Sequence, residues 1–273
     1  EHKKITFHNH FGIVLAADMY VPKGTNGKLP AIAVSGPFGA VKEQSSGLYA
    51  QKLAEMGFLT IAFDPSFTGE SGGQPRDVFS LDINTEDFQA AVDYLSNLPN
   101  VDANRIGILG VCGWGGIALN AAANDPRIKA TVASTMYDMP RVGAWGYNDK
   151  GTADNRYQKK AQIAQLRTKE YVTGVQQRAE TNVPFDQLSG NEPEFMQQYS
   201  AYYTTKRGFH ERSVNSKNGW KLQAMTGWMN NAILSHPEDL RSAVLIVHGE
   251  KAHSRYMGED TFKKLTGNNK QLY

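Results

Sequence analysis

The feature that most constrains this fold is a buried strand that leads directly into a glycine-rich turn and then a helix. Residues 106–110 (IGILG) are apolar, residues 110–116 (GVCGWGG) hold four glycines, and residues 115–124 are rich in alanine. Glycine lets the backbone pack closely against itself, and free N–H groups at a helix start favour a negative charge. The segment therefore has the context of a nucleophile elbow, and Cys112 is its only nucleophilic side chain.

Strand and helix patterns alternate through the rest of the chain. Apolar, β-branched runs predict strands over residues 13–19, 31–35, 59–64, 106–110, 131–134 and 243–248. Amphipathic spacing predicts helices over residues 46–56 and 115–124, and a third that starts after Asn84 as its N-cap. Runs that are apolar throughout are typical of strands buried on both faces. The predicted fold class is therefore α/β, with a doubly wound and mostly parallel sheet.

Composition excludes several classes of protein. The 273 residues suffice for one large domain, and 29 basic against 27 acidic residues give no basis for binding nucleic acid. No apolar run reaches the length of about 18 residues that spans a membrane. A single cysteine excludes a disulfide framework and a cysteine-rich metal site. The sequence allows a homo-oligomer, and the default compartment is the cytoplasm, or the periplasm or outside if a leader preceded Glu1.

The alternation stops over residues 137–237, which are polar, helical in tendency and rich in Gln, Asn, Tyr and Trp. Strand pattern resumes at residue 243, so we interpret this stretch as a helical lid insertion within a single domain of residues 1–273. A solvated helical excursion is the simpler interpretation of part of it. Aromatic side chains over a site favour apolar substrates, and the substrate-binding candidates are Trp114, Tyr137 and Trp145.

Four motifs occur in an order that resembles a known family. They are the strand and turn at 31–39 (AIAVSGPFG), the loop at 63–73 (FDPSFTGESGG), the elbow at 110–116 and the strand at 244–250 (VLIVHGE). Together they resemble the α/β-hydrolase superfamily, in the branch of dienelactone-hydrolase-like and X-Pro-peptidase-like esterases. The resemblance implies the α/β-hydrolase fold over nearly the whole chain, and catalysis at the elbow.

The elbow departs from the pattern of that family, in which small residues stand two positions before and after the nucleophile. Gly110 fits the first of these positions for Cys112, but Trp114 does not fit the second. Centring the pattern on position 114 gives small neighbours but a residue without a nucleophilic atom. The resemblance implies that Cys112 attacks as a thiolate. The alternative is that Cys112 is a small buried apolar residue.

The resemblance also implies an oxyanion hole made of two main-chain N–H groups. One comes from the loop after the strand at 31–35, where Pro37 has no N–H and Phe38 is the better donor. The other comes from Gly113, the residue after the nucleophile.

The acid and base of the expected triad are harder to place. Glu250 is the first candidate for the acid by position, and Asp138 and Asp260 are alternatives. His253 lies in the loop after the strand at 243–248 and is the candidate base, whereas His248 lies within that strand and is taken as structural. In the family the base follows one more strand. Residues 271–273 look like the start of it, so the sequence predicts that most of this strand and its His loop are missing and that the chain is impaired.

The predicted activity is hydrolysis of an ester or related acyl bond in a small, fairly apolar substrate, without a cofactor or metal. Two alternatives stay open. One is a hydrolase fold that binds ligands without catalysis, which the Trp at position 114 and the lack of an Asp near residue 252 favour. The other is an aminopeptidase-like or dipeptidyl-peptidase-like activity.

Overall fold

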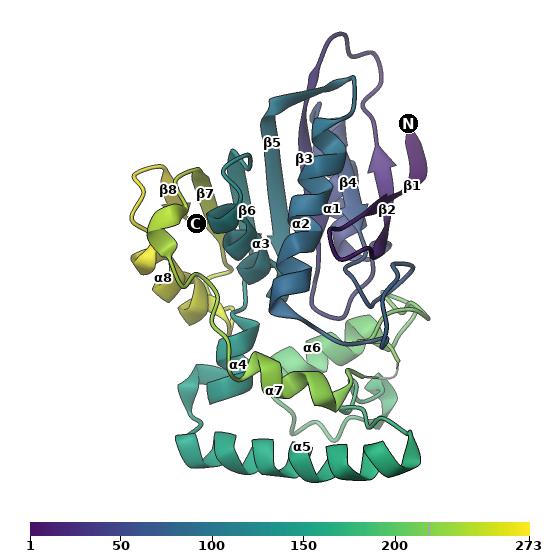
Figure 1. The fold of residues 1–273 in the computed structure, drawn as a ribbon, viewed down its shortest axis with the longest axis vertical. Helices are drawn as coiled ribbons and strands as arrows, with labels where there is room; N and C mark the ends of the chain where they lie inside the picture. The colour runs from purple at the N-terminus through teal and green to yellow at the C-terminus, as the bar shows by residue number, and fades with distance from the viewer. Residues whose placement is uncertain (218) are drawn as a thin grey trace.

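A computed structural model describes residues 1–217 and 219–273, and its centre is one twisted sheet of eight strands (Figure 1). The first two strands of the sheet order run antiparallel to their neighbours, and all the other pairs are parallel. In sheet order the strands are β1 (His2–His8), β2 (Val14–Tyr20), β4 (Leu59–Phe63), β3 (Leu29–Ser35), β5 (Val101–Val111), β6 (Ala130–Ser134), β7 (Ala243–Val247) and β8 (Lys270–Leu272). The predicted α/β class with a mostly parallel sheet is confirmed.

Helices cover both faces of this sheet. They are α1 (Ser45–Glu55), α2 (Leu81–Ser96), α3 (Gly113–Asn124) and α8 (Arg255–Lys264). Strand β4 is buried throughout: Leu59, Ile61 and Phe63 join the core cluster that contains α2 and α3, whereas Ala62 joins a smaller cluster with Ala50 of α1. Alternate side chains of one strand thus pack against helices on opposite faces, which explains the continuous apolar runs.

The register of the parallel strands brings the expected loops together. Ser35 of β3 pairs with Gly110 of β5, and Val111 pairs with Ser134 of β6, which in turn pairs with Val247 of β7. The loops that follow these strands therefore leave the sheet side by side at its carboxyl edge. This is the edge at which open α/β sheets usually bind ligands.

One prediction about a single element needs correction. Helix α2 begins at Leu81 after Ser80, so Asn84 is not its N-cap. Asn84 lies in the first turns, where its Oδ1 accepts a hydrogen bond from the N–H of Ser80 at 3.0 Å. The final residues form the three-residue strand β8, which pairs in parallel with β7, as expected for the start of a last strand at residues 271–273.

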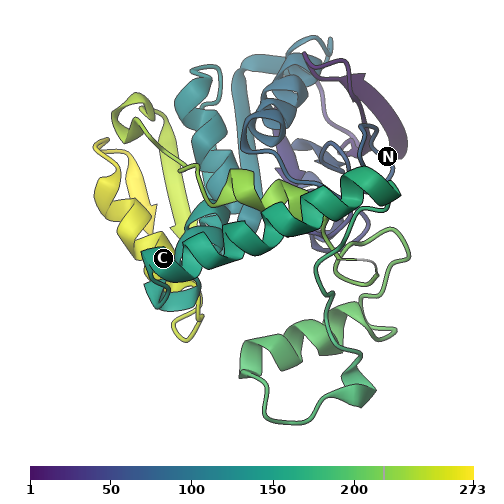
Figure 2. The ribbon, with the colours of Figure 1, turned by 60° about the horizontal axis from the view of Figure 1, so that its bottom comes forward.

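Residues between β6 and β7 form a helical insertion, whose helices are α4 (Met139–Trp145), α5 (Ala153–Thr173), α6 (Glu194–Tyr203) and α7 (Met225–Trp228). Figure 1 shows these helices gathered below the sheet, with the long helix α5 running across the bottom of the molecule. In Figure 2 the segment that carries α6 projects from the rest of the chain. The insertion therefore lies at the carboxyl edge of the sheet, where the loops of the expected site meet.

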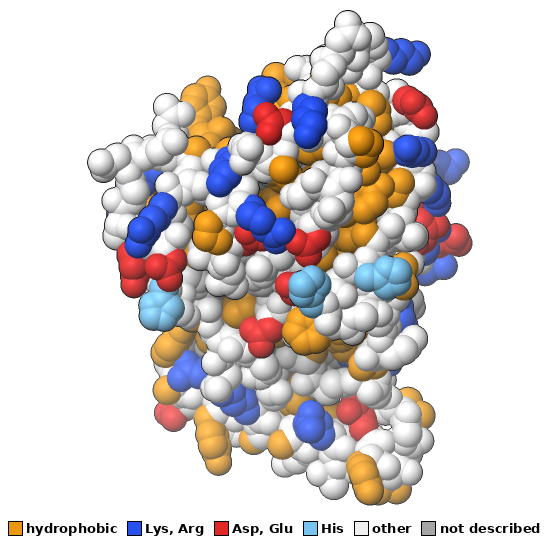
Figure 3. Space-filling view, turned by 45° about the horizontal axis from the view of Figure 1, so that its top comes forward, with side chains coloured by type: hydrophobic (Ala, Val, Ile, Leu, Met, Phe, Trp, Pro, Cys, Tyr) orange, Lys and Arg blue, Asp and Glu red, His pale blue; other side chains and the backbone are white. Residues whose placement is uncertain are grey.

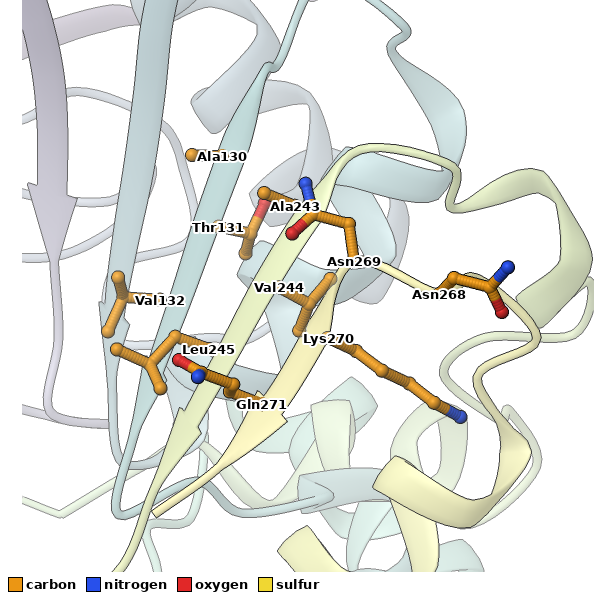
Figure 4. A pocket seen from close by; sticks show the side chains of 10 residues that line it. All are labelled: Ala130, Thr131, Val132, Ala243, Val244, Leu245, Asn268, Asn269, Lys270 and Gln271. Atoms are coloured by element: carbon orange, nitrogen blue, oxygen red, sulfur yellow. The ribbon is translucent and has the colours of Figure 1, made fainter.

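A hollow of about 410 Å³ lies on the opposite part of the sheet, against the first residues of β6 and β7 (Figure 4). Its lining contains Thr131, Asn268, Asn269 and Lys270 but no Cys, His, Asp or Glu. Basic and acidic side chains are intermixed over the face drawn in Figure 3, in keeping with a formal charge of +2. No helix in the described ranges is both long and apolar enough to cross a membrane.

Candidate active site

Cys112 stands at the apex of the turn between β5 and α3. Its backbone has φ +58° and ψ −123°, a conformation that residues other than glycine rarely adopt. Three hydrogen bonds hold it: its N–H donates to Ser134 at 2.9 Å, and its carbonyl accepts from the N–H groups of Gly115 and Tyr137 at 2.9 Å each. A strained and well-anchored residue between a strand and a helix is the geometry of a nucleophile elbow.

Glycines pack closely around Trp114 at this elbow. A Cβ on Gly36 would lie 2.3 Å from the carbonyl oxygen of Val111 and 2.8 Å from the Cβ of Trp114, and one on Gly110 would lie 1.9 Å from the Trp114 carbonyl oxygen. The turn holds the Trp114 side chain fully buried, so the expectation that it does not fit here is wrong, although position 114 departs from the family pattern.

The expectation that Trp114 binds substrate is also wrong. Its side chain is 1% exposed and belongs to the hydrophobic core. The indole ring packs with Phe38 and Phe79, at centroid distances of 5.7 and 6.0 Å. The buried Trp114 ring thus packs against the loop that carries Phe38.

The two expected oxyanion donors, Phe38 and Gly113, lie close together beside Cys112. Burial raises the pKa of the Cys112 thiol from 9.0 to about 11, and the main-chain N–H groups of Gly113 and Phe38 oppose this rise by favouring the thiolate. Their approach depends on Gly113, since a Cβ there would lie 2.8 Å from the Cβ of Phe38. Two donors beside the sulfur can also reach the oxygen of an acyl group attached to it.

Four tyrosines surround the thiol. Burial raises the pKa of each phenol, and a negative charge on Cys112 raises it further, so all four lie within electrostatic reach of the sulfur. Tyr137 follows β6, Tyr147 lies in a short 3-10 turn of the insertion, and Tyr199 and Tyr203 belong to α6. The wall of the site is therefore aromatic, polar and uncharged.

His253 reaches this wall from the loop after β7. Its Nε2 is in hydrogen-bonding contact with the hydroxyl of Tyr137, which lies 2.8 Å from the hydroxyl of Tyr199. The ring of Phe195 stacks on the imidazole at a centroid distance of 3.9 Å. Burial lowers the pKa of His253, so the imidazole is neutral at pH 7 and able to accept a proton.

The structure does not pair the candidate acid with this base. Glu250 is exposed, and its main-chain carbonyl accepts a hydrogen bond from Arg255 at 3.2 Å. Among the described residues no hydrogen bond or ion pair joins its carboxylate to His253. The two alternative acids have structural roles: Asp138 caps α4 by accepting from the N–H of Arg141 at 3.0 Å, and Asp260 forms an ion pair with Arg141 at 3.1 Å.

Two further residues named from the sequence lie elsewhere. Trp145 is 40% exposed, and the guanidinium of Arg156 lies over one face of its ring at 4.2 Å from the centroid. His248 is buried at the end of β7, and burial lowers its pKa to about 4. Within the described part of the chain, neither of its ring nitrogens has a hydrogen-bond partner.

Sequence reasoning missed four aromatic residues of the site: Tyr147, Phe195, Tyr199 and Tyr203. The last three are spaced four residues apart on one face of α6, which is a signal that the sequence does carry. It also missed Asn215, which contacts the loop of Phe38 and has no periodic neighbour to indicate its role.

A cavity of about 350 Å³ lies within the insertion, behind the loop that carries Phe38. Trp220 and Asn215 line it, and both contact Phe38: the Trp220 ring lies 4.3 Å from the Phe38 ring, and Asn215 is hydrogen-bonded to the Phe38 carbonyl. The other walls include the apolar Val183, Leu188 and Met196 and the acidic Glu180 and Glu192. No group of three His, Cys, Asp or Glu in residues 1–217 and 219–273 is arranged to hold a metal ion.

The comparisons with known proteins agree with this geometry. Residues 12–272 match the family described as X-Pro dipeptidyl-peptidase (S15 family). The uncharacterized protein PA2218 of Pseudomonas aeruginosa is 54% identical over 264 residues, which are 96% of this chain and 70% of that protein. Its crystal structure, at 52% identity, covers 100% of this chain and 84% of that chain with a TM-score of 0.95.

Two further proteins extend the comparison. The uncharacterized protein YcjY of Escherichia coli is 34% identical over 281 residues, which are 99% of this chain and 88% of that protein. The structure of DcsB in complex with its substrate analogue shares the fold, with a TM-score of 0.81 at 20% identity over 100% of this chain and 88% of that chain. The resemblance that the four motifs predict is thus confirmed. The chain belongs to the X-Pro dipeptidyl-peptidase (S15) family and has the α/β-hydrolase fold, and both support its assignment as a hydrolase.

Proposed function

We propose that this protein is a cysteine-dependent hydrolase of esters or related acyl compounds whose acyl group is small, uncharged and fairly apolar. The observation that carries the proposal is the position of Cys112 at the apex of the elbow, with Gly113 next to it and packed closely against Phe38. The main-chain N–H groups of these two residues favour the thiolate by lowering the pKa of Cys112. The insertion would act as a lid that supplies the aromatic wall.

In the proposed acylation step, the Cys112 sulfur forms a bond to the acyl carbon. Its proton passes to Nε2 of His253 through the Tyr137 hydroxyl, which gives up one proton and gains another. Phe38 and Gly113 stabilise the oxyanion. When the carbonyl re-forms, the ester C–O bond breaks and His253 gives its proton to the leaving alkoxide. Water then attacks the thioester and loses a proton to His253, which returns it to the sulfur as the free acid leaves.

Glu250 has no part in this scheme, because its carboxylate is exposed and does not contact His253. Stacking on Phe195 and the contact with Tyr137 would orient the imidazole instead. Without a carboxylate partner, the imidazolium form of His253 is less stabilised than the histidine of a complete triad. We therefore expect modest rather than fast turnover.

The surroundings of the thiol favour an uncharged substrate. Burial and two main-chain N–H groups account for the shift of the Cys112 pKa, and no carboxylate is among its causes. A peptidase that holds a free amino terminus needs a negative group near the scissile bond. The aromatic wall around the thiol instead fits acyl groups such as butyryl or benzoyl.

A substrate panel tests the function. Two proteins are assayed: the full product of the reading frame, and the chain of residues 1–273. The ester substrates are p-nitrophenyl acetate, butyrate, octanoate and benzoate, and the peptidase substrates are aminoacyl-proline p-nitroanilides. We expect turnover of the esters, with kcat/KM for the anilides lower by at least about 100-fold. A preference for the anilides would contradict the proposal in favour of a peptidase. Ligand binding without turnover of any substrate would favour a non-catalytic binding protein.

The pH dependence of alkylation gives a second prediction. Because burial raises the pKa of Cys112 to about 11, the thiol is protonated at pH 8. Its alkylation by iodoacetamide at pH 8 should therefore be about 100-fold slower than that of a thiol with a pKa of 9.0. The rate should rise about tenfold per pH unit up to pH 10. Stopped incubations analysed by mass spectrometry measure it, and a plateau below pH 9 would contradict the prediction.

A further inference from the structure

We propose that Asn215, in the insertion, is a positioning residue that holds the oxyanion-hole loop in its working geometry. The inference rests on the proposed function and makes the insertion a part of the acyl-transfer site as well as a cover over it. The loop concerned comprises residues 36–44, between β3 and α1, and includes the donor Phe38.

Asn215 contacts the two peptide groups that follow the donor. Its Nδ2 donates to the carbonyl of Phe38 at 2.7 Å, and its main-chain N–H donates to the carbonyl of Gly39 at 3.1 Å. The hydroxyl of Ser213 donates to the same Gly39 carbonyl at 2.9 Å. The insertion thus fixes both carbonyls that follow the oxyanion donor. The peptide that carries the Phe38 carbonyl and the peptide that carries the Phe38 N–H meet at the Phe38 Cα, so fixing the first restricts the rotations that could turn the second.

The backbone of the loop is shaped for this contact. Gly39 has φ +83°, and a Cβ there would lie 2.3 Å from Oδ1 of Asn215, so a side chain at position 39 would exclude the amide. The contact between Asn215 and the loop therefore depends on glycine at position 39. Asn215 is itself held, because its carbonyl accepts from Nδ2 of Asn182 at 2.9 Å and from the hydroxyl of Thr181 at 3.2 Å.

An ion pair ties the far end of the loop to the same segment of the insertion. The guanidinium of Arg212 lies 2.5 Å from the carboxylate of Glu43. Residues 212–215 therefore bind the loop near both Phe38 and α1. If the Asn215 amide is lost, the Phe38 carbonyl loses its partner and the Phe38–Gly39 peptide gains freedom to rotate. The backbone at Phe38 is then less restrained, and the adjoining N–H that serves as oxyanion donor would lose its alignment.

The test separates oxyanion stabilisation from thiol reactivity. An aldehyde adds the Cys112 S–H across its C=O bond, and the oxygen of the resulting hemithioacetal occupies the oxyanion hole. Alkylation by iodoacetamide forms an S–C bond and releases iodide without forming an oxyanion. Butyraldehyde affinity therefore reports on the hole, and the alkylation rate reports on the thiol alone.

Asn215→Ala and Asn215→Asp are compared with wild type and with Asn231→Ala. Asn231 is a matched control because it is an exposed residue near the end of the insertion, whose Nδ2 donates only to the carbonyl of Gly227. We expect each Asn215 variant to lose about 10- to 100-fold in kcat and in butyraldehyde affinity, with KM within about threefold. Alkylation should change at most about fivefold, since a thiolate accepts a weaker hydrogen bond than an oxyanion. Asn231→Ala should match wild type.

Three outcomes would overturn the proposal. The first is unchanged kcat and aldehyde affinity in folded Asn215 variants. The second is a parallel fall of kcat, alkylation rate and melting temperature, which would make the role merely structural. The third is a wild type whose Cys112 binds no aldehyde. That last result, or full activity in Cys112→Ala, would identify the proposed function itself as the error.

Discussion

Replacing Cys112 with alanine should lower kcat/KM for the best p-nitrophenyl ester by at least about 1,000-fold, a loss of roughly 4 kcal/mol of transition-state stabilisation. Cys112 is the only cysteine and the only side chain of the elbow that can form the acyl intermediate. Alanine keeps the Cβ and therefore the local packing, so the loss would report the missing sulfur. Steady-state kinetics on the purified variant measure it.

Two companion variants make this result interpretable. Cys112→Ser keeps a nucleophilic atom with a much higher pKa and should retain only a few per cent of the activity or less. Cys112→Gly should be inactive yet more stable by about 1 kcal/mol, because glycine adopts φ +58° without strain. Wild-type rates in folded Cys112→Ala would refute the cysteine mechanism.

Replacing Lys42 with methionine should lower the free energy of unfolding at pH 8 by about 3 kcal/mol. The side chain of Lys42 is fully buried, and its Nζ lies 2.5 Å from Glu70, 2.6 Å from Glu43 and 3.4 Å from Asp64. Asp64 is also fully buried, so removing the cation leaves a carboxylate that solvent cannot reach. Urea denaturation followed by circular dichroism measures the change.

The pH dependence of this loss follows from the Asp64 carboxyl. Burial raises its pKa from 3.8 to about 6, and the charge of Lys42 opposes that rise. Because the folded state holds the Asp64 proton more tightly than the unfolded state does, this carboxyl stabilises the fold when it is protonated. The stabilisation decreases as the pH rises from about 4, the pKa in the unfolded chain, to about 6, the pKa in the folded one. Without Lys42 the Asp64 pKa should rise further. Lys42→Met should therefore be less destabilising at pH 5 than at pH 8.

Lys52→Met is the matched control for Lys42→Met, because Lys52 pairs with Glu55 at 2.9 Å on the exposed side of α1. It should cost less than about 0.5 kcal/mol. Adding Asp64→Asn to Lys42→Met should recover part of the lost stability, since the second change removes the unpaired charge. Equal effects of Lys42→Met and Lys52→Met would contradict this account of the buried cluster.

The fold could be predicted from the sequence because its signals are local. All six predicted strands are present, with bounds that agree within a few residues. Runs such as 59–63 are apolar on both faces, so they are stable only in a sheet that is covered on both sides. The start of α2 was misplaced because Asn84 bonds back to the Ser80 N–H from inside the helix. From the sequence alone, a polar residue at the start of an amphipathic run can be either the N-cap that precedes the helix or a residue inside its first turns.

The site could be predicted only where it lies next to a strand end. Cys112, Phe38 and Gly113 follow directly from the motif, and the register of β3 with β5 brings them together. Asn215 and the tyrosines of α6 come from the insertion, whose path is fixed by tertiary contacts rather than by periodicity. Glu250 was chosen by position alone, and the turn in which Ala252 donates to Gly249 at 3.0 Å leaves its carboxylate in solvent.

The close packing of Gly36 against Val111 and Trp114 has a consequence for how relatives should be identified. A Cβ at position 36 would lie 2.3 Å from the carbonyl oxygen of Val111 and 2.8 Å from the Cβ of Trp114, so position 36 has a size requirement of its own. We expect glycine at 36 in relatives whatever the size of the residue at 114. A search pattern that demands a small residue at 114 would discard such proteins, whereas one that demands glycine at 36 would retain them.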